Sequence, residues 1–251
     1  FILKHMRTAD ARLFRTAGPD QPAKLSGYLE DYACLADALI DLYDATFDPK
    51  WLRSSVELAE TMLKHFADKD GPGFYFTADD HEQLLTRTKD LHDGSTPSGN
   101  AMAVTALLRL AALTGRRDLA EPAERTLKGY REQMAEHPAA SGQMLLALDF
   151  HLGPVRQVAI VGPTHGAGTR RAIDAVRRAW GPRRVVAFHD PAAGGPPAEL
   201  ASLFDGKLAS GGREPPEVAV YVCENFACRA PLVGADAVEA AFAASPHAPR
   251  G

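Results

Sequence analysis

The chain has 251 residues, of which 45% are hydrophobic and 24% are charged, and its formal net charge is -4. This length can bury a full hydrophobic core and permits one large domain or two smaller ones. The weakly acidic balance and the scattered arginines give no basic field for nucleic acid or an anionic membrane surface. No apolar run approaches the roughly 20 residues that span a bilayer, and the first residues do not resemble a signal peptide. We therefore expect no nucleic-acid partner, no membrane partner and a cytoplasmic location.

Helical periodicity extends from about residue 28 to residue 152. The expected helices are 28–47, 49–66, 97–114, 118–136 and 139–152. The second and fourth are amphipathic, which is typical of outer helices, whereas the third and fifth are almost free of charge, which is typical of inner ones. This alternation predicts a mainly α domain, residues 1–153, built as part of an α/α toroid in which helical hairpins form a ring. Five long helices can form only an open part of such a ring.

After Pro154 the pattern changes to short apolar runs that are typical of buried strands. The expected strands are 158–161, 185–188 and 218–222, with helices at 169–180, near 198–204 and near 235–244. Residues 154–251 are therefore predicted to form a small parallel α/β unit. Cys34 is expected to be a small buried thiol of the first helix. Since the chain starts with Phe1, we expect it to be a fragment.

Two polar stretches lie where hydrophobic helices are expected to begin. Residues 89–100 carry a lysine, two aspartates, a histidine and an asparagine ahead of the third helix, and residues 27–33 carry two carboxylates at the start of the first. On the first helix, Asp31 falls on the same face as the apolar residues Leu35 and Leu42. Unpaired N–H groups and the helix dipole favour an anion in this first turn. The two stretches together predict the walls of one pocket.

Five motifs carry a family resemblance: residues 27–33, 73–77, 89–94, 97–100 and 221–228. In this order they resemble the thioredoxin-domain-containing proteins related to spermatogenesis-associated protein 20. The resemblance implies a thioredoxin-like domain followed by an (α/α)6 toroid of the six-hairpin glycosidase and N-acylglucosamine 2-epimerase kind, with an α/β piece near the end. This chain would supply only the C-terminal part. The thioredoxin-like domain and the remaining toroid helices of the parent chain would then be its partners.

Toroids of the glycosidase type use paired carboxylates as acid, base or nucleophile. Asp31, on an apolar face, is the candidate general acid, whereas Asp90 or Asp93, beside Lys89, is expected to remain ionised and act as base. Glu30 is a further candidate. The side chains that could bind a sugar are those of Tyr28, Tyr32, Tyr75, His92, Ser98 and Asn100. His92 departs from the family, which more often has an aromatic residue there. No metal and no cofactor are expected.

Structural roles compete with each of these assignments. Asp31 could cap its helix, Lys89 could pair with Asp90 to hold the loop, and Glu30 could be solvated. The tyrosines could belong to the core, and Ser98 and Asn100 to an ordinary helix start.

Two further motifs have simpler explanations. Residues 162–168 could cradle a phosphate but fit no nucleotide fingerprint, so a plain strand-to-helix turn is favoured. Cys223 and Cys228 lack the further ligands of a zinc site and the spacing of a Cys-X-X-Cys redox pair, so structural thiols are expected.

Two hypotheses about function follow. In the first, the parent protein is a carbohydrate-active enzyme, a hydrolase or epimerase. In the second, the toroid is a recognition scaffold that presents a protein or peptide to the thioredoxin-like domain, and the carboxylates are structural. A closed, carboxylate-lined cavity would favour the enzyme, and a shallow apolar groove would favour the scaffold.

Overall fold

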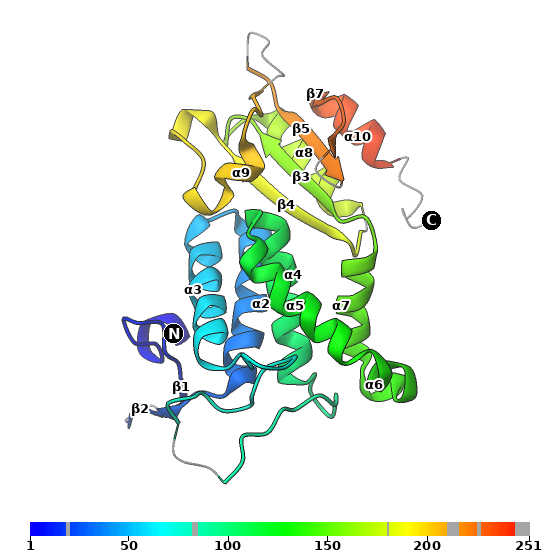
Figure 1. Ribbon diagram of the computed structural model, residues 1–251. Helices are drawn as coiled ribbons and strands as arrows, with labels where there is room; N and C mark the ends of the chain where they lie inside the picture. Colours follow the sequence, from blue (N-terminus) through cyan, green and yellow to red (C-terminus); the bar gives the residue numbers. More distant parts are fainter. Residues whose placement is uncertain (19–20, 82–84, 180, 210–215, 225–226, 244–251) are drawn as a thin grey trace. The chain divides into compact units, whose positions relative to one another are not determined.

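A computed structural model describes residues 1–18, 21–81, 85–179, 181–209, 216–224 and 227–243 of the chain (Figure 1). The contacts between residues divide it into two compact units. The first, here called the helical unit, comprises Phe1–Ala111 and Arg116–Leu152, and the second, called the sheet unit, comprises Ala112–Gly115 and Gly153–Gly251. Within the described residues, none of the helices has the length and apolar character needed to cross a membrane.

The helical unit is built mainly from the helices that the periodicity predicts. Its helices are α1 (Ile2–His5), α2 (Leu29–Thr46), α3 (Pro49–His65), α4 (Gly99–Thr114, whose last residues group with the sheet unit), α5 (Arg117–Gly129), α6 (Arg131–Glu136) and α7 (Gly142–Leu152), with a 3-10 turn, η1, at Pro138–Ala140. The predicted helix 118–136 is divided at Tyr130 into α5 and α6. The expectation of a mainly helical chain is confirmed.

Local sequence explains where these helices begin and which faces they bury. Asp48 accepts a hydrogen bond from the N–H of Lys50, and Pro49 takes the first helical position of α3. Helix α4 is buried on nearly all sides, as its lack of charge predicts. By contrast, α7 is equally apolar but buries only Met144 and Ala147 fully, and most of its other residues are half-buried.

The buried face of α2 differs from the expected one. Tyr32, Leu39 and Ile40 are among its buried residues, whereas Leu42 is 43% exposed and Cys34 is also exposed. The expectation of a buried Cys34 thiol is therefore wrong. The face that carries Asp31, Leu35 and Leu42 looks outward because the opposite face packs into the unit.

A small antiparallel hairpin, which the sequence analysis did not predict, precedes α2. It consists of β1 (Phe14–Gly18) and β2 (Gln21–Ser26), with Phe14 opposite Ser26. All residues of its two strands are exposed or half-buried, so it lacks the apolar run by which a buried strand is recognised.

The sheet unit contains one mixed sheet with the strand order β4-β3-β5-β6, and β7 pairs with β5. Its strands are β3 (Arg156–Val161), β4 (Arg184–His189), β5 (Ala219–Glu224), β6 (Ala227–Cys228) and β7 (Leu232–Val233). Strands β3 and β4 are parallel, as expected, but β5 is antiparallel to β3, with Val158 opposite Val222. The expected all-parallel sheet is thus corrected. A short buried strand is apolar in either direction, so its composition does not reveal its orientation.

The helices of this unit are α8 (Ala167–Arg178), α9 (Ala201–Phe204) and α10 (Ala235–Ala243), with 3-10 turns η2 (Pro191–Ala193) and η3 (Ala198–Leu200). Helices α8 and α10 pack against each other. The ends of two predicted helices, at Trp180 and Ala244, lie outside the described residues.

Candidate functional site

A pocket of about 490 Å³ lies in the helical unit and joins the two polar stretches. Thr96 and Pro97 come from the loop before α4, and Glu30 and Asp31 come from the first turn of α2. This volume falls in the range of small-molecule sites. The pocket is lined by Ile2, Met6, Leu13, Phe14, Arg15, Glu30, Asp31, Cys34, Leu35, Thr96 and Pro97. We call it the α2 pocket.

Close packing of two helix starts explains why these stretches meet. A side chain at Gly99 would lie within 3.3 Å of the backbone nitrogen of Glu30 and within 3.2 Å of Leu29. Glycine therefore lets the start of α4 approach the start of α2 directly.

The two carboxylates of the α2 pocket are joined by one guanidinium. Arg15 Nη1 donates to Glu30 Oε1 at 3.0 Å and to Asp31 Oδ2 at 2.9 Å. The same Asp31 oxygen accepts a hydrogen bond from the N–H of Tyr28 at 2.8 Å. Asp31 therefore holds the start of its helix, in the manner of the acidic member of a capping box. Arg15 also lies over the ring of Tyr28, with 4.6 Å to its centroid.

Cys34 supplies a thiol to the wall of the α2 pocket. Partial burial raises its pKa, and the neighbouring carboxylates of Glu30, Asp37 and Asp31 raise it further. Because the thiolate is the reactive form, this environment does not activate Cys34 as a nucleophile.

Asn100 occupies a buried position within the other polar stretch. Its side-chain oxygen accepts from the N–H of Phe74 at 2.7 Å, and its Nδ2 donates to the carbonyls of Phe74 and Asp90 at 2.9 and 2.8 Å. Gly73, at φ +86°, leaves room for this contact, because a side chain there would meet Asn100 Oδ1 and the Tyr130 hydroxyl. Asn100 thus ties two loops to the start of α4.

Asp93 and Ser98 cap helices. The two carboxylate oxygens of Asp93 accept from the N–H groups of Ser98 and Gln143 at 2.9 and 2.7 Å, at the starts of α4 and α7. Ser98 is buried, and its hydroxyl accepts from the N–H of Ala101 at 3.2 Å. These contacts are those of an ordinary helix start, the structural alternative given for Ser98 in the sequence analysis.

Lys89 pairs with Asp68 and also donates to the carbonyl of Pro72 at 2.6 Å. The hydrogen bond from Lys89, with those from the N–H groups of Asp70 and Gly71, lowers the pKa of Asp68 to about 2. The expected neighbour of Lys89, Asp90, is exposed, and its carboxylate contacts the N–H of His92 at 3.4 Å.

The aromatic candidates are divided between core and surface. Tyr32 is fully buried, and its hydroxyl accepts from the N–H of Leu13 at 2.8 Å. Tyr28 is half-buried and stacks on Phe76, with ring centroids 4.5 Å apart. Tyr75 lies beneath two cations, Arg87 and Lys89. His92 is exposed. Neither Tyr75 nor His92 lines the α2 pocket.

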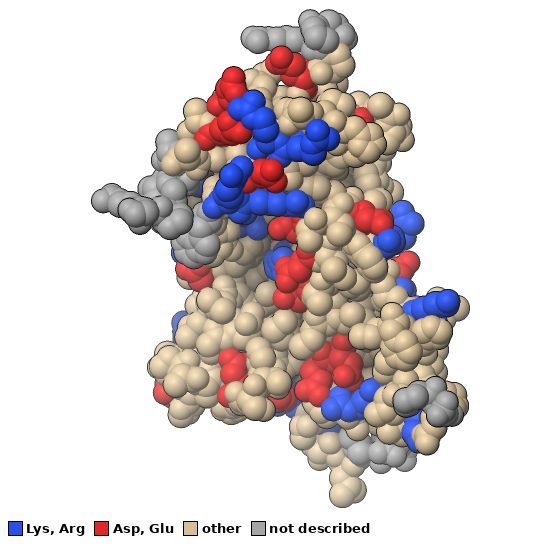
Figure 2. All heavy atoms as spheres, turned by 180° about the vertical axis from the view of Figure 1, so that it is seen from behind, with Lys and Arg blue, Asp and Glu red and all other residues tan. Residues whose placement is uncertain are grey.

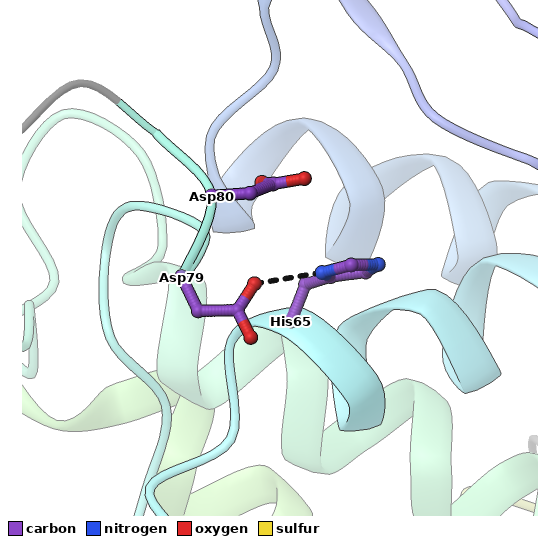
Figure 3. Close-up of side chains that lie close together, drawn as sticks. All are labelled: His65, Asp79 and Asp80. Carbon is purple, nitrogen blue, oxygen red and sulfur yellow. Dashed lines mark hydrogen bonds and ion pairs between the residues drawn. The ribbon is translucent and has the colours of Figure 1, made fainter.

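One group of side chains in the described part of the chain has the spacing of metal ligands: His65, Asp79 and Asp80 (Figure 3). His65 Nδ1 lies 2.7 Å from Asp79 Oδ1. Both oxygens of Asp80, however, accept from the guanidinium of Arg12 at 2.6 and 2.7 Å, which lowers the pKa of that carboxyl. A cation already neutralises this carboxylate, so the group fits an ion-pair network better than a metal site.

Arg15 and Asp68 are the residues that sequence reasoning missed. Arg15 lies in the unpredicted β1, and Asp68 is separated from Lys89 by 21 residues. No local spacing in the sequence links either residue to its partner. The Gly73-Phe74 motif was the only signal that the segment near Asp68 belongs to this region.

On the face shown in Figure 2, acidic and basic side chains are interspersed. This matches the scattered charge of the sequence and shows no broad basic surface on that face.

Comparison with known proteins finds relatives with one shared name in three mammals. It is 32% identical to human spermatogenesis-associated protein 20 over 241 residues, and 31% identical to the mouse and rat proteins of the same name. The chain is homologous to spermatogenesis-associated protein 20. Each match covers 92% of this chain but only 30% of the relative, so the chain spans less than a third of the length of these relatives. No protein-family model matches the sequence.

The homology covers both units, since 92% of the chain is matched. Four motifs that carried the family resemblance, residues 27–33, 73–77, 89–94 and 97–100, all contribute to the helix starts and loops described above. In the structure these four motifs meet where the starts of α2 and α4 pack together with the loops before them. The α2 pocket lies next to this region.

Proposed function

We propose that the helical unit is a recognition module of a protein related to spermatogenesis-associated protein 20, and that the α2 pocket binds a segment of another protein or peptide. The observation that carries this proposal is that the expected acid, Asp31, and one of the two expected bases, Asp93, are held by structural contacts. Asp31 is held by Arg15 and the N–H of Tyr28, and Asp93 is held by the starts of two helices. Carboxylates with such contacts stabilise the fold and are poorly placed to transfer a proton.

The lining of the α2 pocket suits a peptide with apolar side chains. Met6, Phe14 and Leu35 supply apolar surface, and the paired charges of Arg15 and Glu30 lie at the same pocket. Protein recognition sites combine apolar surface with polar groups in this way.

A peptide-binding assay tests this proposal. A library of peptides that combine apolar and basic residues would be screened against the full chain by fluorescence anisotropy. Leu35→Glu, in the lining, should weaken binding at least about tenfold. Ala38→Glu is the matched control, because Ala38 is exposed on the same helix and outside the lining. Equal binding by both variants, or no binding by the unaltered chain, would reject the α2 pocket as a peptide site.

A second candidate function, a carbohydrate-active acid/base site, is favoured by one observation. Glu30 lies at a pocket of about 490 Å³ together with a second carboxylate, Asp31, and this volume would hold a sugar. In this reading Glu30, which pairs with Arg15, is the candidate for the acid or base at this pocket. A thermal-shift screen with mono- and disaccharides distinguishes the two functions. Saturable stabilisation by one sugar class, with turnover lost in Glu30→Gln, would favour the enzyme.

A further inference from the structure

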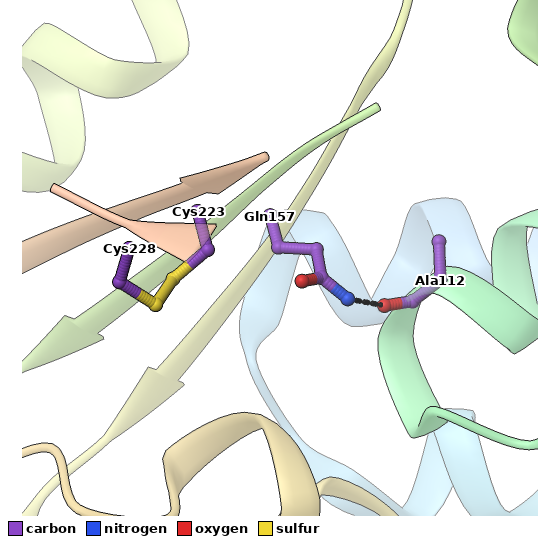
Figure 4. Close-up of a disulfide and its surroundings, with 4 residues drawn as sticks. All are labelled: Ala112, Gln157, Cys223 and Cys228. Atoms are coloured by element: carbon purple, nitrogen blue, oxygen red, sulfur yellow. Dashed lines mark hydrogen bonds between the residues drawn. A yellow bond between two sulfur atoms is a disulfide. The ribbon is translucent and has the colours of Figure 1, made fainter. Parts of the chain in front are cut away.

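Cys223 and Cys228 form a disulfide within the sheet unit (Figure 4). Cys223 lies on β5 and Cys228 on β6, and the two are register partners of the antiparallel pair, with Cα atoms 3.9 Å apart. The expectation of two structural thiols is therefore wrong. Strand β6 ends the strand order of the sheet, so the disulfide lies at an edge.

The two sulfur-bearing residues differ in accessibility. Cys223 is only 2% exposed, and its neighbour across the ladder is Gln157 on β3, whose amide donates to the carbonyl of Ala112 at 2.7 Å (Figure 4). Cys228 is exposed, as are Ala227 and Arg229 on either side of it. A nucleophile from solution can therefore approach the disulfide from the side of Cys228.

The charges beside the disulfide favour a thiolate. Glu224, next to Cys223, is paired with Arg156 at 2.7 Å and lies 3.8 Å from Arg229, next to Cys228. Two guanidiniums thus share one carboxylate, which leaves a positive excess. Positive charge near a cysteine attracts an incoming thiolate and stabilises a departing one.

The disulfide is expected to add little stability, because the fold already brings the two cysteines together. Only five positions separate the two cysteines, and the strand ladder sets them opposite each other without a covalent bond. A crosslink stabilises mainly by restricting the unfolded chain, and this effect is smaller for a short loop than for a long one. A role beyond stability is therefore in keeping with its position.

We propose that Cys223–Cys228 is a reversible dithiol/disulfide site that exchanges two electrons with a dithiol, and that Cys228 is the sulfur attacked. A thiolate of the dithiol bonds to Cys228 Sγ, the S–S bond breaks, and Cys223 leaves as a thiolate and takes up a proton. The second thiolate of the dithiol then displaces Cys228, which is protonated in turn. The dithiol becomes a disulfide, and the pair gains two electrons and two protons.

The first experiment measures reduction of the folded chain. In a Cys34→Ser background, which removes the remaining cysteine, the native protein is treated with about 1 mM dithiothreitol, quenched with acid, alkylated and weighed by mass spectrometry. We expect two alkyl groups within minutes, with the far-UV circular dichroism unchanged, and return of the disulfide in oxidised glutathione. A pair that is reduced only after denaturant is added, or that does not form again, overturns the proposal.

A matched pair of variants identifies the attacked sulfur. With Cys223→Ser, only Cys228 remains in the pair, and we expect it to form a mixed disulfide with glutathione disulfide at least about tenfold faster than Cys223 does in the Cys228→Ser variant. Equal rates, or a faster Cys223, would contradict the assigned order of steps. Arg229→Ala should slow reduction by dithiothreitol about threefold at low salt and much less at 1 M salt, where surface charge is screened. No change at low salt would remove the electrostatic part of the proposal.

Discussion

One carboxylate, that of Asp93, holds the starts of two helices. Its oxygens accept from Ser98 at α4 and Gln143 at α7. Asp93→Ala should lower the free energy of unfolding by about 2 kcal/mol, because two capping hydrogen bonds are lost together. Urea denaturation measures this. Asp90→Ala is the control and should cost less than about 0.5 kcal/mol, since Asp90 is exposed. Equal losses would contradict the capping role.

A second prediction at this scale concerns pH. Lys89 and two backbone N–H groups lower the pKa of Asp68 to about 2, below its ordinary value of 3.8. A carboxyl whose pKa is lower in the folded state contributes stability above the unfolded pKa, and this contribution disappears as the pH falls through the folded one. Between about pH 5 and pH 2 the unaltered chain should therefore lose more stability than Asp68→Asn. Parallel pH curves for the two proteins would show that Asp68 contributes nothing.

At the scale of a helix, α2 offers a direct test of which face is buried. Leu39 is 1% exposed and Leu42 is 43% exposed on the same helix. Leu39→Ala should cost about 2 to 4 kcal/mol, because it leaves a cavity, whereas Leu42→Ala should cost less than about 1 kcal/mol. Chemical denaturation of the two variants compares them. A larger loss for Leu42→Ala would restore the face assigned from the sequence pattern.

The same helix shows which contacts the sequence could not predict. The amphipathic pattern of α3 identified its buried face, because its charged residues are exposed or half-buried. On α2, Asp37 pairs with Arg109 of α4 at 2.6 Å, and burial raises the pKa of Asp37. The partner is 72 residues away, so no local pattern reveals that this acid faces another helix. The predicted direction of β5 was wrong for a similar reason, because the tertiary fold determines which strands pair.

The candidate site was predicted in outline and not in its contacts. Glu30, Asp31 and the loop before α4 do meet at one pocket, as the two polar stretches suggested. Lys89 and Asp93, however, are engaged by Asp68 and by two helix starts. Residue type indicates that a polar group needs a partner, but the partner depends on which segments the fold brings together.

For the molecule as a whole, the exposed leucine of α7 leads us to expect self-association of the chain. This apolar helix buries only two residues, and Leu146 is 65% exposed. Leu152, at the end of the same helix, is 72% exposed, and neighbouring exposed apolar side chains favour association in water. Sedimentation velocity of the full chain should show reversible self-association that Leu146→Glu reduces. Leu208→Glu, at a site of similar exposure in the sheet unit, is the control and should leave association unchanged. A chain that stays monomeric at all concentrations would contradict this prediction.

The position of Asn100 has a consequence for how the chain tolerates mutation and ageing. Its amide donates to two carbonyls and accepts from one N–H in a buried place. Aspartate, which differs by one nucleotide in the codon and is also the product of spontaneous deamidation, has the same shape but no donor. It would set a negative charge against two carbonyl oxygens. The smallest chemical change available at this residue is therefore among the most damaging.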